Sequence, residues 1–235
     1  MHERTRCAIL LFALCGMVGR AEAQGADFPD LPVHALPAAG SDSLLAVILT
    51  GDGNWAEIDR VIAAQLVERG VAVVGLESRS YLNHGGPKSP DVIGRDLERL
   101  LRHYMALWKR SRVIVIGYSR GAELAPFGVS RLPADLRRRV QLLVLLAPAP
   151  NANFTFHLTD LLSDKVRNDD LAMLPEMAKL TGTRVLCVYG TEEKHSLCPL
   201  LPAGAAHVVA TVGGHHLDRD FAALAALIHV ESQSR

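Results

Sequence analysis

A serine flanked by glycines lies at the centre of a motif that could carry out a chemical reaction. Residues 117–121 read Gly-Tyr-Ser-Arg-Gly, the G-x-S-x-G pattern in which the serine hydroxyl acts as a nucleophile. An apolar run, residues 113–116, precedes the motif, and a helix-forming segment follows it. A tight strand-to-helix turn needs glycines beside the serine and exposes its hydroxyl at a helix N-terminus. We therefore predict that Ser119 is the nucleophile.

A serine hydroxyl needs a base to take its proton, and two adjacent histidines are the candidates. His215 and His216 follow Gly213 and Gly214 late in the chain, just after the last expected strand. Adjacent residues of an extended segment point in opposite directions, so only one of the two is expected to face Ser119. We predict that His215 is the base, with His216 as the alternative.

A carboxylate must orient the base and stabilise its protonated form. Residues 191–193 read Thr-Glu-Glu and directly follow an expected strand that ends at Gly190. The spacing favours Glu193, with Glu192 as the alternative. The order serine, glutamate, histidine along the chain is that of α/β hydrolases. Four aspartates are weaker candidates: Asp160, Asp164, Asp169 and Asp170.

Acyl transfer also needs N–H donors for the negative oxygen that develops on the substrate. The backbone N–H of Arg120, directly after the serine, is expected to be one donor. The other is expected from the turn after the first core strand, residues 50–53, which read Thr-Gly-Asp-Gly. We favour the amide of Asp52 in this oxyanion hole, with that of Gly53 as the alternative.

Strands and helices must alternate along the chain to place these loops at one edge of a sheet. Strand-like apolar runs occupy residues 44–50, 71–76, 113–116, 140–146, 184–189 and 207–211. Helical spacing of apolar residues occupies residues 55–66, 90–108, 122–131 and 219–229. Continuous apolar strands that alternate with helices predict a mostly parallel sheet covered by helices on both faces. With the serine motif, this pattern predicts the α/β-hydrolase fold.

Three segments fall outside this alternation. Residues 24–43 contain three prolines and are expected to be irregular, with one edge strand. Residues 80–90 are expected to be a loop. Residues 151–180 are expected to form a small cap or insertion over the mouth of the site.

The first 23 residues have the features of a secretory signal peptide. Arg4 and Arg6 precede an apolar stretch, residues 8–18, and residues 21–23 read Ala-Glu-Ala, a cleavage site. We predict a signal peptide at residues 1–23 and a single domain at residues 24–235. Cys187 and Cys198 are the cysteines of such an exported chain and are predicted to form a disulfide. Two separate buried thiols are the alternative.

Composition and motifs argue against several classes of function. The chain has 25 Lys and Arg residues and 25 Asp and Glu residues, so no overall charge favours nucleic acid, and we expect no nucleic-acid partner. It lacks the glycine-rich patterns that bind nucleotides. The histidines and cysteines at positions 187, 195, 198, 215 and 216 lack a metal-ligand spacing. We therefore expect neither a cofactor nor a metal.

The chain resembles the VirJ/AcvB-type bacterial virulence proteins over residues 44–228. The resemblance rests on residues 50–55 (TGDGNW), 117–122 (GYSRGA), 197–199 (LCP) and 213–218 (GGHHLD). It implies a periplasmic α/β hydrolase that cleaves the ester between amino acid and headgroup in aminoacylated phosphatidylglycerol, chiefly the lysyl form. The serine role then lies with Ser119 and the base role with His215 or His216. The implied partners are this lipid ester, met in transient contact with a membrane surface, and proteins of type IV secretion.

Two positions depart from the family's pattern. Asn54 stands where a second glycine is usual, and Arg120 stands where an aromatic residue is usual. Arg120 could contact a lipid phosphate, or its side chain could extend from the helix start into solvent. Two other functions stay open: hydrolysis of another ester or thioester, because a fold does not name a substrate, and a non-catalytic adaptor role in secretion.

Overall fold

The computed structural model describes residues 23–24, 28–40, 42–155 and 169–234, so residues 1–22 of the predicted signal peptide lie outside the described residues. The strands of the main sheet are β1 (Ala23–Gln24), β2 (Val33–Leu36), β3 (Leu44–Leu49), β4 (Ala72–Leu76), β5 (Arg112–Tyr118), β6 (Val140–Leu146), β9 (Val185–Gly190) and β10 (His207–Thr211). Among the described residues their order is β1-β2-β4-β3-β5-β6-β9-β10. The six strands from β4 to β10 in this order are parallel, whereas β2 pairs antiparallel with β4 and β1 with β2.

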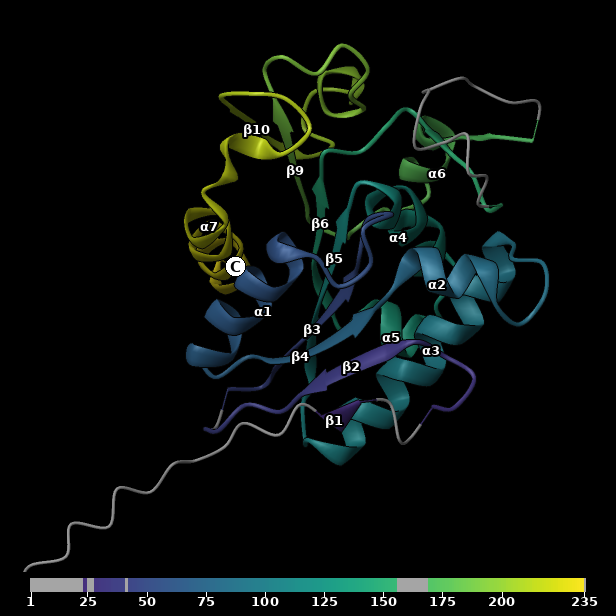
Figure 1. The fold of residues 1–235 in the computed structure, drawn as a ribbon, viewed down its shortest axis with the longest axis vertical. Coiled ribbons are helices and arrows are strands. Elements are labelled where there is room, and N and C mark those ends of the chain that lie inside the picture. Colours follow the sequence, from purple (N-terminus) through teal and green to yellow (C-terminus); the bar gives the residue numbers. More distant parts are fainter. Residues whose placement is uncertain (1–22, 25–27, 41, 156–168, 235) are drawn as a thin grey trace, which may run out of the picture.

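Burial along the strands follows their apolar content. Every residue of β3 and β4 is buried, as the continuous apolar runs predict for strands covered on both faces. The edge strand β10 is partly exposed. The carboxyl ends of β3, β5 and β9 lie at one edge of the sheet, so the loops that follow them meet there (Figure 1).

Helices cover both faces of the sheet. They are α1 (Glu57–Glu68), α2 (Ser78–Asn83), α3 (Pro90–Leu107), α4 (Arg120–Ser130), α5 (Ala134–Arg137), α6 (Met173–Met177) and α7 (Phe221–Gln233). Figure 1 shows α1 and α7 on one face and α3 and α4 on the other. Each face has its own apolar cluster, with Ile62 and Leu224 in one and Leu97 and Phe127 in the other. The chain therefore has the predicted sheet with helices on both faces.

Two sequence-based expectations about elements are wrong. The segment expected to be a loop, residues 80–90, begins inside α2, because the Tyr81 N–H donates to the Glu77 carbonyl and the Tyr81 hydroxyl donates to buried Asp96 at 2.8 Å. Trp55 lies before α1 and not on it. Its ring stacks on His34 at 4.6 Å and occupies the space where a side chain at Gly75 would lie.

The start of the last helix also differs from expectation. The last helix begins at Phe221 and not at residue 219, because the Asp220 carboxylate accepts the Ala223 N–H at 2.9 Å and caps the helix. In the segment expected to be a cap, residues 156–168 lie outside the described residues. Its described parts are β7 (Asn151–Ala152), β8 (Leu171–Ala172) and α6, which packs against α4.

No helix in the described part of the chain is long and apolar enough to cross a membrane.

Candidate active site

Ser119 lies in the crowded turn between β5 and α4. Its φ is 51°, in the left-handed region that residues other than glycine rarely adopt. A Cβ atom on Gly121 would lie 1.9 Å from the Leu49 carbonyl oxygen, and one on Gly117 would lie 2.4 Å from the Gly121 carbonyl oxygen. The turn therefore requires both glycines, and the surrounding backbone holds Ser119 in a strained conformation at the wall of a cavity.

Ser119, His215 and Glu193 form a chain of hydrogen bonds. His215 Nε2 lies 2.8 Å from Ser119 Oγ, and His215 Nδ1 lies 2.8 Å from Glu193 Oε1. The second carboxylate oxygen of Glu193 accepts the Gly190 N–H at 3.0 Å. In this geometry the imidazole can take the serine proton on Nε2 while the carboxylate holds the proton on Nδ1.

The alternative base and acid have other contacts. His216 Nδ1 lies 3.1 Å from the Tyr118 hydroxyl. The side chain of Glu192 is exposed, and the backbone N–H of this residue donates to the Gly213 carbonyl at 2.9 Å. The structure thus brings His215 and Glu193 to Ser119, and places His216 and Glu192 beside them.

The weaker acid candidates are also placed. Asp160 and Asp164 lie outside the described residues. Asp170 lines the cavity and accepts a hydrogen bond from Asn153 Nδ2 at 2.6 Å, whereas Asp169 is exposed.

The loops that carry Glu193 and His215 pack against each other through their backbones. The Thr191 N–H donates to the Thr211 carbonyl at 2.8 Å. A Cβ atom on Gly190 would lie 2.1 Å from the Gly214 carbonyl oxygen. The sequence marks Gly190 only as the end of a strand, and the structure shows that its lack of a side chain lets the two loops meet.

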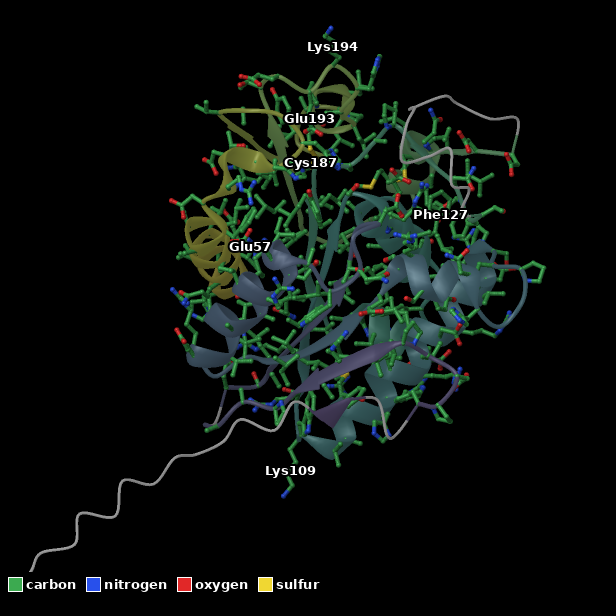
Figure 2. The ribbon with its side chains drawn as sticks, in the orientation of Figure 1. Glu57, Lys109, Phe127, Cys187, Glu193 and Lys194 are labelled. Carbon is green, nitrogen blue, oxygen red and sulfur yellow. A yellow bond between two sulfur atoms is a disulfide. The ribbon has the colours of Figure 1, made fainter. Side chains whose placement is uncertain are left out.

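The predicted disulfide between Cys187 and Cys198 is confirmed, with 5.5 Å between the Cα atoms. Cys187 lies in β9, before the loop that carries Glu193, and Cys198 lies after it. Both side chains are buried. In Figure 2 Cys187 lies below Glu193, while Lys194 extends outward from the molecule. The disulfide therefore anchors both ends of the acid loop to the core.

The turn between β3 and α1 contains the second expected oxyanion donor. Asp52 and Gly53 line the cavity together with Ser119. The ends of the turn are attached to α2, because the Ser78 N–H donates to Thr50 Oγ1 at 3.1 Å and Asn54 Nδ2 donates to Ser80 Oγ at 3.0 Å. Asn54 thus attaches the end of the turn to α2.

Arg120 is buried beside the nucleophile. The interpretation that its side chain extends into solvent is wrong, because the side chain is only 9 % exposed and is held by two carboxylates. Its Nε and Nη2 each lie 3.4 Å from one oxygen of Asp52, and its Nη1 lies 3.1 Å from Glu123 Oε2. Burial raises the pKa of Glu123 to about 7, although the positive charge of Arg120 partly offsets this effect.

The cavity in front of Ser119 has a volume of about 1200 Å³. Its described wall contains six acidic residues, Asp52, Glu57, Glu123, Asp170, Glu192 and Glu193. It contains three residues with a fixed positive charge, Arg120, Lys194 and Arg219. Acidic residues therefore outnumber basic ones in the described wall, although burial leaves Glu123 only partly ionised near pH 7. Burial raises the pKa of Tyr118, also in the wall, to about 12, so its hydroxyl stays protonated.

The described residues contain no group of three or more His, Cys, Asp or Glu side chains that could hold a metal ion.

Comparison by sequence gives the family of the chain. Residues 43–235 match the bacterial virulence protein family VirJ. The chain belongs to the VirJ family. No curated protein matches the sequence.

Solved structures similar to this VirJ-family chain share its fold. Est1E from Butyrivibrio proteoclasticus, also solved with ferulic acid bound, is 15% identical, with a TM-score of 0.60 over 89% of this chain and 98% of that one. An esterase of Pyrococcus furiosus is 15% identical, with a TM-score of 0.60 over 86% of this chain and 84% of that one. A thioesterase domain from the curacin biosynthetic pathway is 15% identical, with a TM-score of 0.58 over 89% and 99%. These likenesses show that the fold is that of an α/β hydrolase.

Proposed function

We propose that this protein is a serine hydrolase of the periplasm that cleaves the aminoacyl ester of aminoacylated phosphatidylglycerol, chiefly the lysyl form. The observation that carries the proposal is the chain of hydrogen bonds from Ser119 through His215 to Glu193 at the wall of a large cavity. Membership of the VirJ family and the α/β-hydrolase fold support it. A strained serine with a hydrogen-bonded base and an oriented carboxylate is the arrangement that acyl transfer requires.

The first half of the reaction forms an acyl-enzyme. Ser119 Oγ attacks the carbonyl carbon of the aminoacyl ester while His215 Nε2 takes its proton. The backbone N–H groups of Arg120 and Asp52 stabilise the negative oxygen of the tetrahedral intermediate, with that of Gly53 as the alternative to Asp52. The bond to the glycerol oxygen then breaks, and His215 gives this oxygen its proton.

The second half releases the amino acid. A water molecule loses a proton to His215 Nε2 and attacks the acyl carbon, and the proton then returns to Ser119 Oγ as the acyl bond breaks. Glu193 accepts the Nδ1 proton of His215 in a hydrogen bond throughout and stabilises the imidazolium that forms in each half.

The charge of the cavity supports an aminoacyl substrate. A lysyl ester carries two ammonium groups, and six acidic residues face three basic ones in the described wall of the cavity. Carboxylates in a partly enclosed cavity attract cations more strongly than the same groups in water, because the effective dielectric constant there is lower.

The disulfide supports export. Disulfides persist in oxidising compartments such as the bacterial periplasm and are rare in the cytosol. The bond between Cys187 and Cys198 anchors the loop of the proposed acid, so the proposed site is suited to such a compartment.

The test is the release of lysine from vesicles of lysyl-phosphatidylglycerol by the protein without residues 1–23 and by its Ser119→Ala variant. We expect release by the unmodified protein and a decrease in kcat of about 10⁶-fold in the variant. Equal release by both proteins would remove Ser119 from the mechanism.

A second candidate function is hydrolysis of another ester or thioester. The structural likeness to Est1E and to the curacin thioesterase domain favours it. Cleavage of 4-nitrophenyl esters by the unmodified protein alone, with lysyl-phosphatidylglycerol left intact, would select this function. Failure to cleave any ester, together with no labelling of Ser119 by a fluorophosphonate, would leave the adaptor role.

A further inference from the structure

We infer that the Arg120 side chain is a positioning residue that joins the two halves of the oxyanion hole, by holding Asp52 against the start of α4. The inference rests on the proposed function, because it concerns the donors that stabilise the negative oxygen formed during acyl transfer. It assigns a role to the side chain of Arg120 in addition to that of its backbone N–H.

Arg120 belongs to both halves of this hole. As the first residue of α4, it directly follows Ser119 and supplies the first proposed donor from its backbone. Its guanidinium reaches back to the turn between β3 and α1, where Nε and Nη2 each lie 3.4 Å from a different oxygen of Asp52. One residue thus connects the helix start with the turn that supplies the second donor.

The pairing between Arg120 and Asp52 restricts orientation as well as distance. A planar guanidinium that meets a carboxylate through two nitrogens and two oxygens allows few relative orientations. The Arg120 side chain is 9 % exposed and that of Asp52 is 21 % exposed. Glu123, one turn further along α4, lies 3.1 Å from the third guanidinium nitrogen, Nη1. A carboxylate of α4 and a carboxylate of the turn therefore both hold the guanidinium.

At the centre of the turn, Asp52 offers a side chain that another residue can hold. Gly51 and Gly53 flank it, and glycines leave a backbone more freedom than other residues do. The side chains of Thr50 and Asn54 attach only the two ends of the turn, through hydrogen bonds to α2. Without the ion pair to Arg120, the peptide unit that carries the Asp52 N–H would lose its side-chain link to α4 and keep the hydrogen bond within the turn from the Asn54 N–H to the Gly51 carbonyl.

This role predicts a loss in kcat and not in substrate binding. Hydrogen bonds to the developing negative oxygen are strongest in the transition state, so a displaced donor lowers kcat and leaves KM nearly unchanged. An Arg120 that instead bound a phosphate of the substrate would affect KM, and only for substrates that carry a phosphate.

The experiment is a double-mutant cycle with Arg120→Met, Asp52→Ala and the double variant. Activity is measured on 4-nitrophenyl acetate, which carries neither phosphate nor ammonium, and on vesicles of lysyl-phosphatidylglycerol. The rate at which a fluorophosphonate labels Ser119 is measured as well. We expect each single variant to lose about 10- to 100-fold in kcat and in labelling rate, because a misplaced donor costs somewhat less than an absent one. The double variant is expected to lose no more than the larger single loss, because both substitutions break the same connection.

Arg131→Met is the matched control. Arg131 lies at the other end of α4, where it pairs with buried Glu176 at 2.7 Å. The Arg131→Met substitution also removes an ion pair from this helix. We expect it to lower the melting temperature, while kcat and the rate of Ser119 labelling stay as in the unmodified protein. If Arg120→Met does not fold, Asp52→Ala tests the inference alone, because Arg120 keeps Glu123 as a partner there.

Three results would overturn the inference. Unchanged kcat and labelling in Asp52→Ala and Arg120→Met would show that the pairing positions nothing. Losses that multiply in the double variant would show that the two residues act separately. A loss confined to the lipid substrate would make Arg120 a substrate-binding residue. In all three cases the unmodified protein still cleaves esters, whereas a protein that neither cleaves an ester nor is labelled at Ser119 contradicts the proposed function itself.

Discussion

The turn that carries Ser119 and the loop that carries Glu193 hold the two ends of one hydrogen-bond chain by different means. The serine turn is positioned by close packing of backbone on backbone, since a Cβ atom on Gly121 would lie 1.9 Å from the Leu49 carbonyl oxygen. The acid loop extends beyond the end of β9. Gly190 at its start packs closely against the histidine loop, and the rest of the acid loop is held by hydrogen bonds to that loop and by a disulfide that spans it.

This difference predicts two kinds of response to mutation. A closely packed turn has no space into which it can relax, so an added methyl group there destabilises the whole fold. A tethered loop can lose one attachment and keep the others, so its changes are expected to lower activity before they unfold the protein.

The largest effect is expected at the acid. Glu193→Gln keeps the size of the side chain and removes the charge that stabilises the His215 imidazolium. We expect kcat on 4-nitrophenyl acetate to fall by about 10³- to 10⁴-fold with little change in melting temperature. Glu192→Gln, one residue earlier and exposed, is the matched control and should lose far less. Equal losses in the two variants would contradict the assignment of Glu193.

The next largest effect is expected in the serine turn. Gly121→Ala places a methyl group 1.9 Å from the Leu49 carbonyl oxygen, far inside van der Waals contact distance, so we expect the free energy of unfolding to fall by more than about 3 kcal/mol. Gly214→Ala is the control in the histidine loop, because no atom lies within 4 Å of its added Cβ. Urea denaturation of both variants measures the difference. Similar stability of the two would mean that the serine turn is not held by packing.

A smaller effect is expected from the disulfide. Cys187→Ala combined with Cys198→Ala frees the acid loop in the folded protein and removes a constraint on the unfolded chain. We expect the free energy of unfolding to fall by about 2–3 kcal/mol. We also expect kcat to decrease, since Glu193 is then held less firmly. Denaturation and ester cleavage measure the two effects, with mass analysis under reduction to verify the bond. An unchanged kcat would show that backbone hydrogen bonds alone position the acid.

The smallest effect concerns the strain at Ser119. Ser119→Gly and Ser119→Ala both remove the hydroxyl, but only glycine adopts a φ of 51° at low cost. We therefore expect the free energy of unfolding of the glycine variant to be about 1 kcal/mol higher than that of the alanine variant, while both are inactive. Thermal unfolding of this matched pair measures the strain relieved by glycine minus the cost of its greater freedom in the unfolded chain. A glycine variant less stable than the alanine variant by about 0.4–1 kcal/mol would show that the turn stores no strain.

The contrast between α4 and α2 illustrates how much of the fold could be predicted. The sequence predicts a helix over residues 122–131, close to the observed α4 (Arg120–Ser130), because an apolar strand, a glycine-rich turn and a segment of helical periodicity follow one another locally. The short helix Ser78–Asn83 was not expected. Its sequence resembles a loop, and a hydrogen bond from Tyr81 to Asp96 on α3 accompanies the helical conformation. Local pattern predicted the first, and a tertiary contact accompanies the second.

By itself the sequence determined the strand and helix alternation and the position of the serine turn, because these depend on apolar periodicity and on residues next to each other in the chain. It narrowed the base to His215 and His216 and the acid to Glu193 and Glu192. Only the tertiary structure showed which histidine contacts Ser119 and which glutamate contacts that histidine, since His215 lies 96 positions from Ser119. The burial of Arg120 against Asp52, 68 positions away, was likewise decided by the packing of separate loops at one edge of the sheet.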